Sequence, residues 1–196
     1  MKKYLITSSE FYTDAPEIFR EKLLKQIQIH QPQYALFRDK TTSNYELLAE
    51  IFIAVCKEFK NLKSFLHRDI SLAQKLGATG VHLTSTQFSE IPKAKENKLE
   101  VIISTHSHEE VLKAQDLGAD AVTYSPIFFS PNKGEPKGIE DLKTLLAKCE
   151  IKVFALGGII STKQIELLEE TESYGFASIR CFYNNFPAKA PLAKDH

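Results

Sequence analysis

Two segments of this chain repeat one another at a distance of 41 residues. Residues 73–81 read Ala-Gln-Lys-Leu-Gly-Ala-Thr-Gly-Val, and residues 114–122 read Ala-Gln-Asp-Leu-Gly-Ala-Asp-Ala-Val. Each copy consists of the end of an amphipathic helix, a glycine stop and the start of an apolar strand. A helix–glycine–strand unit that recurs indicates stacked βα units. In such folds the carboxyl ends of the parallel strands meet at one end of the molecule, and binding and catalytic residues are expected there.

Eight short strand-like segments, most of them followed by a helical pattern, extend this unit along the chain. The predicted strands are residues 3–8, 34–37, 64–66, 80–83, 99–103, 121–124, 151–156 and 176–179. The predicted helices include residues 15–29, a helix capped by Ser43, residues 108–117 behind a Ser107 cap, and a weak last helix in the C-terminal tail. This alternation predicts a single-domain (β/α)8 TIM barrel over residues 1–196. An open doubly wound sheet is the alternative, and the strand count and the Gly-Gly pair after the seventh strand favour closure.

Charge balance and cysteine use narrow the class of protein. Lys plus Arg and Asp plus Glu number 25 each, so no global basic field favours nucleic acid or an anionic membrane. The N-terminus has only a short apolar run, which argues against a signal peptide or a membrane span. Three widely spaced cysteines (Cys56, Cys149 and Cys181) form neither a metal motif nor a disulfide framework, which favours reduced thiols in a cytoplasmic protein.

Two cations follow the second predicted strand. Arg38 and Lys40 stand at positions i and i+2, so their side chains point to the same face at the mouth of the barrel. A forked guanidinium and a point-charge ammonium together suit a phosphate or pyrophosphate. The alternative is a structural ion pair between Arg38 and Asp39 or another acid of the barrel.

The loop after the sixth strand brings a hydroxyl, an amide and an ammonium within four residues: Ser130, Asn132 and Lys133. Such a loop could close over an anionic ligand, and an ordinary solvated turn is the alternative.

Further anion-binding candidates follow the last two strands. Gly157 and Gly158 follow the seventh strand and open onto a helix near residue 162, so backbone amides and a helix N-terminus could meet a phosphate. Ile179 and Arg180 follow the eighth strand, and the loops after strands seven and eight are the usual phosphate site of this barrel class.

Three histidines lie near strand ends: His67, His82 and His106. His82 follows Val81 inside an apolar strand and is interpreted as a hydrogen-bonded core histidine. His67 ends the third strand and is better placed for function. No pair of these histidines has a compact zinc spacing, so no metal site is predicted from them.

Five segments in chain order resemble the thiamine phosphate synthase family, which shares its barrel with the bacterial thiazole tautomerases. They are similar to the family's Gln-Leu-Arg-Glu-Lys (36–40), Gly-Val-His-Leu (80–83), Ser-x-His (104–106), Gly-Pro-Ile-Phe followed by Thr, Thr and Lys (125–133), and Ala-Ile-Gly-Gly-Ile (155–159). Each segment lies at the carboxyl end of a predicted strand, which strengthens the resemblance.

The resemblance implies a transferase that joins an aminopyrimidine pyrophosphate to a thiazole phosphate and releases pyrophosphate through a pyrimidine cation. By this resemblance, Arg38, Lys40 and Lys133 would bind the pyrophosphate, and Ser104 would bind the pyrimidine. Ser130 and Asn132 would bind the thiazole phosphate from the loop after the sixth strand. Gly158, Ile179 and Arg180 would bind the same phosphate mainly through their backbone. The implied partners are small phosphorylated heterocycles, and a homodimer is compatible with the sequence.

The chain departs from the family at positions that matter for the chemistry. The two aspartates that hold the family's Mg²⁺ are replaced by Arg68 and Gln87, and the glutamine of the strand-two motif is Leu36. A hard divalent cation therefore lacks its carboxylates. The tautomerases use a histidine shortly after strand six, and that position is Pro126 here.

Three functions stay open at this point. The first is a synthase in which the Arg68 guanidinium takes the place of the metal. The second is a metal-independent tautomerase in which His67 or His106 supplies the acid or base. The third is a non-catalytic binder of phosphate ligands.

Overall fold

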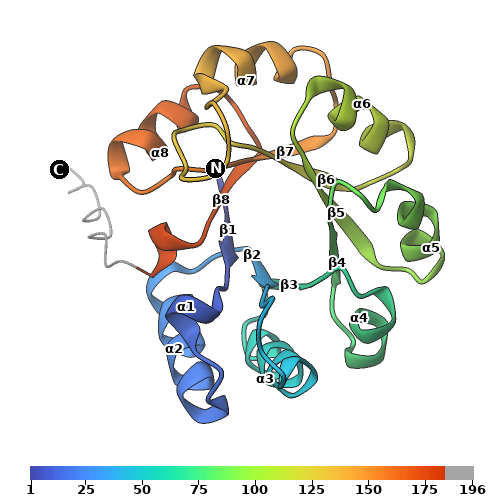
Figure 1. The fold of residues 1–196 in the computed structure, drawn as a ribbon, viewed down its shortest axis with the longest axis vertical. Helices are drawn as coiled ribbons and strands as arrows, with labels where there is room; N and C mark the ends of the chain where they lie inside the picture. The colour runs from blue at the N-terminus through green and yellow to red at the C-terminus, as the bar shows by residue number, and fades with distance from the viewer. Residues whose placement is uncertain (184–196) are drawn as a thin grey trace, which may run out of the picture.

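The computed structural model describes residues 1–183 and shows a closed barrel of eight parallel strands (Figure 1). The strands are paired in chain order, and β8 pairs with β1 to close the ring. Their bounds are β1 Lys2–Ile6, β2 Tyr34–Phe37, β3 Lys63–His67, β4 Gly80–Leu83, β5 Glu100–Thr105, β6 Ala121–Tyr124, β7 Lys152–Leu156 and β8 Gly175–Ser178. The predicted barrel is confirmed, and the open sheet is wrong.

Helices surround the strands on the outside of the ring (Figure 1). Their bounds are α1 Ser9–Tyr12, α2 Pro16–His30, α3 Tyr45–Lys57, α4 Ile70–Leu76, α5 Ile91–Glu96, α6 His108–Asp116, α7 Gly138–Leu146 and α8 Thr162–Glu169, with short 3₁₀ turns η1 Phe88–Glu90 and η2 Arg180–Phe182. The short helix α1 was not predicted, because four residues are too few to show a helical period. The weak last helix predicted in the tail lies outside the described residues.

Two N-cap residues were predicted from the sequence, and the first residues of α6 and α3 show whether they are correct. Ser107 caps α6 as expected, because its Oγ accepts a hydrogen bond from the Glu110 amide at 3.1 Å. The Ser43 cap is wrong: α3 begins one residue later than that cap would require, with Asn44 at the N-cap position.

The inward-facing residues of the barrel form layers, because side chains on a strand alternate with a period of two. Near the amino ends, Tyr4, Tyr34, Phe65 and Phe154 pack together with ring centroids 5.0–5.9 Å apart. All four side chains are at most 5% exposed, so these rings fill the centre of the barrel.

The next inward position along each strand belongs to the layer above the rings. Two residues after Tyr4 comes Ile6, two after Phe65 comes His67, and two after Phe154 comes Leu156. The same step leads from Gly80 to His82 and from Ile102 to Ser104. This second layer contains the side chains that face the carboxyl-end loops.

Glycines at the start of two strands make room for the rings. A Cβ on Gly80 would lie 2.5 Å from Cε1 of Phe65, and one on Gly175 would lie 2.7 Å from Cε1 of Phe154. Both positions therefore require glycine if the aromatic layer is to close.

The remaining sequence expectations concern membranes and thiols. No helix of the described part is long and apolar enough to cross a bilayer. All three cysteines are free thiols; Cys56 and Cys181 are buried, and Cys149 is half-buried.

Candidate functional site

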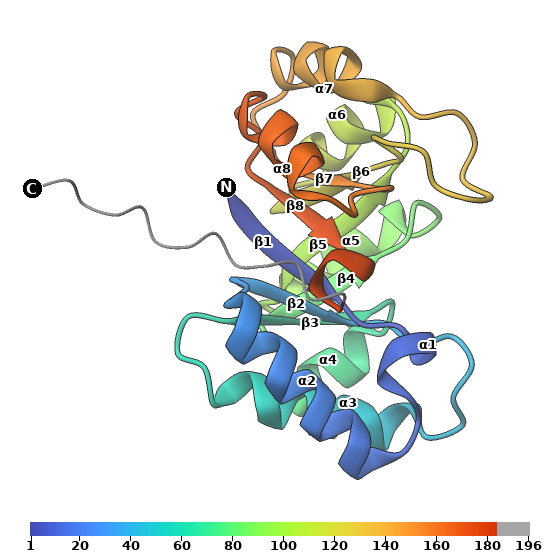
Figure 2. The same cartoon turned by 90° about the vertical axis from the view of Figure 1, so that its left-hand side faces the viewer.

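A cavity of about 440 Å³ lies at the carboxyl ends of the strands, above the aromatic layer. This volume is in the range of small-molecule sites. Figure 2 shows that the loops after β2 and β6 project from this same end of the barrel. Most of the predicted site residues line the cavity: Arg38, Lys40, His67, Ser104, Ser130, Lys133, Gly157, Gly158, Ile179 and Arg180.

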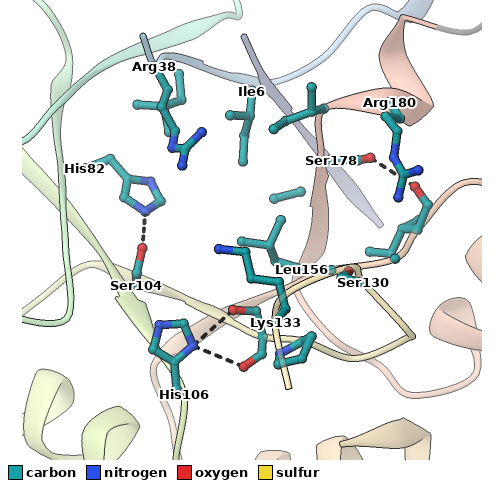
Figure 3. Close-up of a pocket in the computed structure, with 18 of the residues that line it drawn as sticks. Ile6, Arg38, His82, Ser104, His106, Ser130, Lys133, Leu156, Ser178 and Arg180 are labelled. Atoms are coloured by element: carbon teal, nitrogen blue, oxygen red, sulfur yellow. Dashed lines mark hydrogen bonds between the residues drawn. The ribbon is translucent and has the colours of Figure 1, made fainter. Parts of the chain in front are cut away.

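The loop after β2 presents two free cations to the cavity. Arg38 and Lys133 point into it in Figure 3, and Lys40 lines it as well. The carboxylate of Asp39 accepts hydrogen bonds from the backbone amides of Thr41 and Thr42 instead. The structural ion pair between Arg38 and Asp39 is therefore wrong, and none of the salt bridges found in residues 1–183 involves Arg38, Lys40 or Lys133.

These cations repel one another. Arg38 lowers the pKa of Lys40 most, followed by burial, Lys133 and Arg68. Burial lowers the pKa of Arg38. The described residues that line the cavity include no Asp or Glu. An anion in the cavity would relieve this repulsion, so the electrostatics favour a phosphate or pyrophosphate.

The opposite side of the cavity is built mainly from backbone. Gly157 and Gly158 follow β7 with φ angles of 103° and 69°, which favour glycine. A Cβ on Gly158 would lie 2.4 Å from the Phe129 carbonyl oxygen, so the loops after β6 and β7 touch at this point. The Gly158 carbonyl accepts a hydrogen bond from Gln164 on α8 at 2.7 Å, which fixes the turn against the start of that helix.

The loop after β6 brings two of its three predicted residues to the site. Ser130 and Lys133 line the cavity. Asn132 does not: it lies exposed at the turn with a φ of 61°, in a conformation that asparagine tolerates better than most residues. The turn directs Ser130 and Lys133 toward the cavity and Asn132 away from it, so the structure does not bring Asn132 to the site. Its contact with a thiazole phosphate stays a prediction.

The three histidines differ in their surroundings. His82 is 3% exposed, and both ring nitrogens are hydrogen-bonded, to Tyr4 at 2.8 Å and Ser104 at 3.0 Å. It is the predicted hydrogen-bonded core histidine, and its edge also lines the cavity. Burial lowers the pKa of His67 to about 4, with Arg38, Arg68 and Lys40 adding to the effect, so His67 is neutral near pH 7.

His106 has the most open position of the three. It lies exposed at the rim, with its Nδ1 3.2 Å from both the carbonyl oxygen and the Oγ of Ser125.

The loops after β3 and β4 do not fit a magnesium ion. Asp69 points away and caps α4, where its carboxylate accepts a hydrogen bond from the Leu72 amide at 2.9 Å. The Gln87 Oε1 accepts from the amide and hydroxyl of Thr84, and its Nε2 donates to the Arg68 carbonyl at 3.3 Å. Within residues 1–183, no group of three His, Cys, Asp or Glu side chains could hold a metal ion. The side chains at this position supply neither the carboxylates nor the free oxygens that Mg²⁺ requires.

Sequence reasoning missed several lining residues. Ile6, Thr84, Ser85, Ser125, Leu156 and Ser178 also face the cavity. The period of two along each strand could have identified Ile6 and Leu156, because they follow the inward-facing Tyr4 and Phe154.

Comparisons with known proteins show the family of this chain. The family described as "Thiamine monophosphate synthase" matches residues 3–182. A protein of Aquifex aeolicus (strain VF5) named "Putative thiamine-phosphate synthase 2" is 34% identical over 187 residues, which cover 91% of this chain and 96% of that protein. The "Thiamine-phosphate synthase" of Bacillus cereus (strain AH187) is 30% identical over 178 residues, which cover 85% of this chain and 78% of the relative.

A solved structure supports the fold. The thiamine phosphate pyrophosphorylase from Pyrococcus furiosus superposes with a TM-score of 0.77 at 24% identity, covering 91% of this chain and 85% of that one. The family match and the relatives indicate a diphosphorylase-like transferase associated with thiamine biosynthesis. The chain belongs to the thiamine monophosphate synthase family.

Proposed function

We propose that this protein joins an aminopyrimidine pyrophosphate to a thiazole phosphate and releases pyrophosphate. The observation that carries the proposal is the convergence of Arg38, Lys40 and Lys133 on one cavity whose described lining contains no carboxylate. The opposite side, formed by Gly157 and Gly158 before α8, suits a second phosphate. Two anion subsites in one cavity match the two anionic substrates of this reaction.

The chemistry follows from the charges. The bond between the pyrimidine methylene carbon and the pyrophosphate oxygen breaks, and the oxygen keeps the electron pair. Arg38, Lys40 and Lys133 stabilise the negative charge that develops on this leaving group. The thiazole nitrogen then gives its lone pair to the methylene carbon, and a new C–N bond forms. Holding both reactants in one cavity supplies the orientation that this capture needs.

Product formation from the two substrates tests the proposal. Purified protein is incubated with both substrates, and thiamine phosphate and pyrophosphate are measured together, in MgCl₂ and in EDTA. We expect both products in equal amounts, and a loss of rate of tenfold or more in Lys133→Ala. Lys93→Ala is the matched control, since Lys93 lies on the exposed face of α5. Absence of thiamine phosphate under both conditions would refute the synthase.

The misfit at the magnesium position gives a separate expectation. Because Asp69 and Gln87 are both engaged elsewhere, we expect no tight Mg²⁺ binding between the loops after β3 and β4. Calorimetry with Mg²⁺, in the presence of pyrophosphate, measures this directly. A well-occupied octahedral metal at residues 67–69 would contradict this expectation.

A second candidate, thiazole tautomerisation, is favoured by one contact. The Ser125 carbonyl oxygen can only accept, so its 3.2 Å contact with His106 Nδ1 is satisfied when Nδ1 carries the proton. In the neutral ring with this tautomer, Nε2 carries the lone pair and can act as a base. Interconversion of thiazole carboxylate phosphate isomers in EDTA, followed by proton NMR, tests this function. Retention of the full rate in His106→Gln would exclude His106 as the base.

A further inference from the structure

A hydrogen-bonded chain runs from the barrel interior to the cavity. The hydroxyl of Tyr4 on β1 lies 2.8 Å from Nδ1 of His82 on β4. The Nε2 of His82 lies 3.0 Å from Oγ of Ser104 on β5. Figure 3 shows the second of these contacts at the edge of the cavity. The chain thus links a residue in the aromatic layer to one that can touch a ligand.

The surroundings of Tyr4 determine which way its hydroxyl proton points. Tyr4 is 0% exposed, and the rings of Tyr34, Phe65 and Phe154 lie 5.1–5.9 Å from its own. Within residues 1–183, His82 Nδ1 is the hydrogen-bond partner found for this hydroxyl. If Nδ1 carried a proton, the hydroxyl would have to accept it, and the tyrosine proton would face aromatic carbon. The satisfied arrangement has Tyr4 donating to an unprotonated Nδ1.

The tautomer of His82 then determines whether Ser104 accepts or donates the hydrogen bond between them. Burial lowers the pKa of His82 to about 3, with His67 and Arg38 adding to the effect, so the ring is neutral and carries one proton. With Nδ1 accepting, that proton is on Nε2 and is donated to Ser104 Oγ. Because Ser104 Oγ accepts this bond, its own hydroxyl proton is free to be donated to another group. Ser104 lines the cavity, so that group can be a bound ligand.

The lining of the cavity indicates what this proton meets. The apolar residues among those that line it include Ile6, Leu36, Leu156 and Ala177. These apolar side chains suit the face of a flat ring better than a pyrophosphate. A hydrogen-bond acceptor at the edge of such a ring would complete the chain.

We propose that Tyr4 is a positioning residue that fixes the tautomer of His82, so that Ser104 donates a hydrogen bond to a ring nitrogen of the bound heterocycle. This assignment of the ring nitrogen rests on the proposed function. The tautomer itself is a property of the free protein.

The tautomer is measured without any ligand. Long-range ¹H–¹⁵N NMR spectra of ¹⁵N-histidine-labelled protein distinguish a protonated Nε2 from a protonated Nδ1, and His82→Gln assigns the signal. We expect protonated Nε2 in the unchanged protein. In Tyr4→Phe we expect the Nδ1 resonance to shift and the Nε2-protonated share to fall. Tyr34→Phe is the matched control, because the Tyr34 hydroxyl bonds to Tyr174 instead. A protonated Nδ1 in the unchanged protein, or an unchanged His82 signal in Tyr4→Phe, would overturn the proposal.

Binding tests the coupling to Ser104. Calorimetry with the aminopyrimidine pyrophosphate alone is expected to show about tenfold weaker binding in Ser104→Ala and about threefold weaker binding in Tyr4→Phe. If Tyr4 acts through Ser104, Tyr4→Phe has no further effect when Ser104 is already alanine. Full additivity would refute the coupling. An equal loss of affinity for inorganic pyrophosphate in Ser104→Ala would refute the ring as its partner. Because no turnover is measured, failure of the synthase reaction leaves both results interpretable.

Discussion

The two sides of the cavity offer an anion different kinds of contact. On the β2 side, Arg38 and Lys40 carry full charges on long side chains. On the β7 side, Gly157 and Gly158 expose the peptide backbone at left-handed φ angles before a helix. The charged side depends on which residue is present, whereas the backbone side depends on the absence of a Cβ. The same ligand chemistry can therefore be lost through two unrelated kinds of substitution.

The largest effect is expected on the backbone side, from Gly158→Ala. The new Cβ would meet the Phe129 carbonyl oxygen at 2.4 Å, and an L-residue at a φ of 69° costs about 1–2 kcal/mol by itself. We expect loss of thiazole phosphate binding together with a lower unfolding temperature, measured by calorimetry and thermal melts. The matched control is Gly118→Ala, which has a φ of 82° but no atom within 4 Å. Equal losses of stability in the two variants would show that the contact with the β6 loop is unimportant.

Substitutions of the charged side chains come next: Arg38 on the β2 side and Lys133 in the loop after β6. Arg38→Ala and Lys133→Ala should each weaken pyrophosphate binding tenfold or more, since charge-assisted bonds to phosphate contribute about 1.5–3 kcal/mol. The loss should shrink as salt is raised, unlike the loss in Gly158→Ala. Isothermal titration at two salt concentrations measures both. Arg20→Ala is the control, because Arg20 pairs with Glu58 on the exposed surface. Unchanged affinity in both cavity variants would disprove the site.

Acid sensitivity is the third expected effect, and it concerns His82 on β4, whose pKa is lowered by burial and, in addition, by His67 and by Arg38 of the β2 side. The pKa of His82 is about 3 in the folded protein, against an ordinary value of 6.5. Below pH 6.5 the unfolded chain therefore binds a proton that the folded chain does not take up until about pH 3. Stability is complete above pH 6.5 and falls with pH, by about 2 kcal/mol between pH 7 and pH 5. Urea unfolding at these two pH values measures the loss. The slope should be shallower in His82→Gln, and identical slopes would contradict the assignment.

The smallest effect is expected from Arg180→Ala. Arg180 lines the cavity at the start of η2, but the phosphate on this side is expected to bind mainly to backbone. We therefore expect thiazole phosphate binding to weaken by less than about threefold, the level of an exposed pair. A tenfold loss by calorimetry would mean that this side also depends on a charged side chain.

Sequence reasoning predicted the parts of the site that depend on local order. The repeat around Gly77 and Gly118 predicted parallel βα units, and the strand ends then identified Arg38, Lys133 and Gly158. The turn that sends Asn132 outward was not predictable, because its φ of 61° depends on how the whole loop folds. The hydrogen-bond partners of Asp39 and Asp69 were not predictable either. The sequence shows where a carboxylate is, but it does not show which backbone amide donates to it.

The hydrogen-bonded chain could not be predicted because it depends on barrel closure. Tyr4 and His82 are 78 residues apart, and they meet only because β1 and β4 face each other across the same interior. The interpretation of His82 as a core histidine was confirmed, but the sequence contained no signal for its partners.

The packed rings at the base of the barrel also affect kinetics. Because the buried rings of Tyr4, Tyr34, Phe65 and Phe154 fill the centre of the barrel, we expect molecules to reach and leave the cavity through one opening. In the proposed reaction, pyrophosphate that has not yet departed would exclude the next pyrimidine substrate. Product inhibition by pyrophosphate should accordingly be competitive with that substrate.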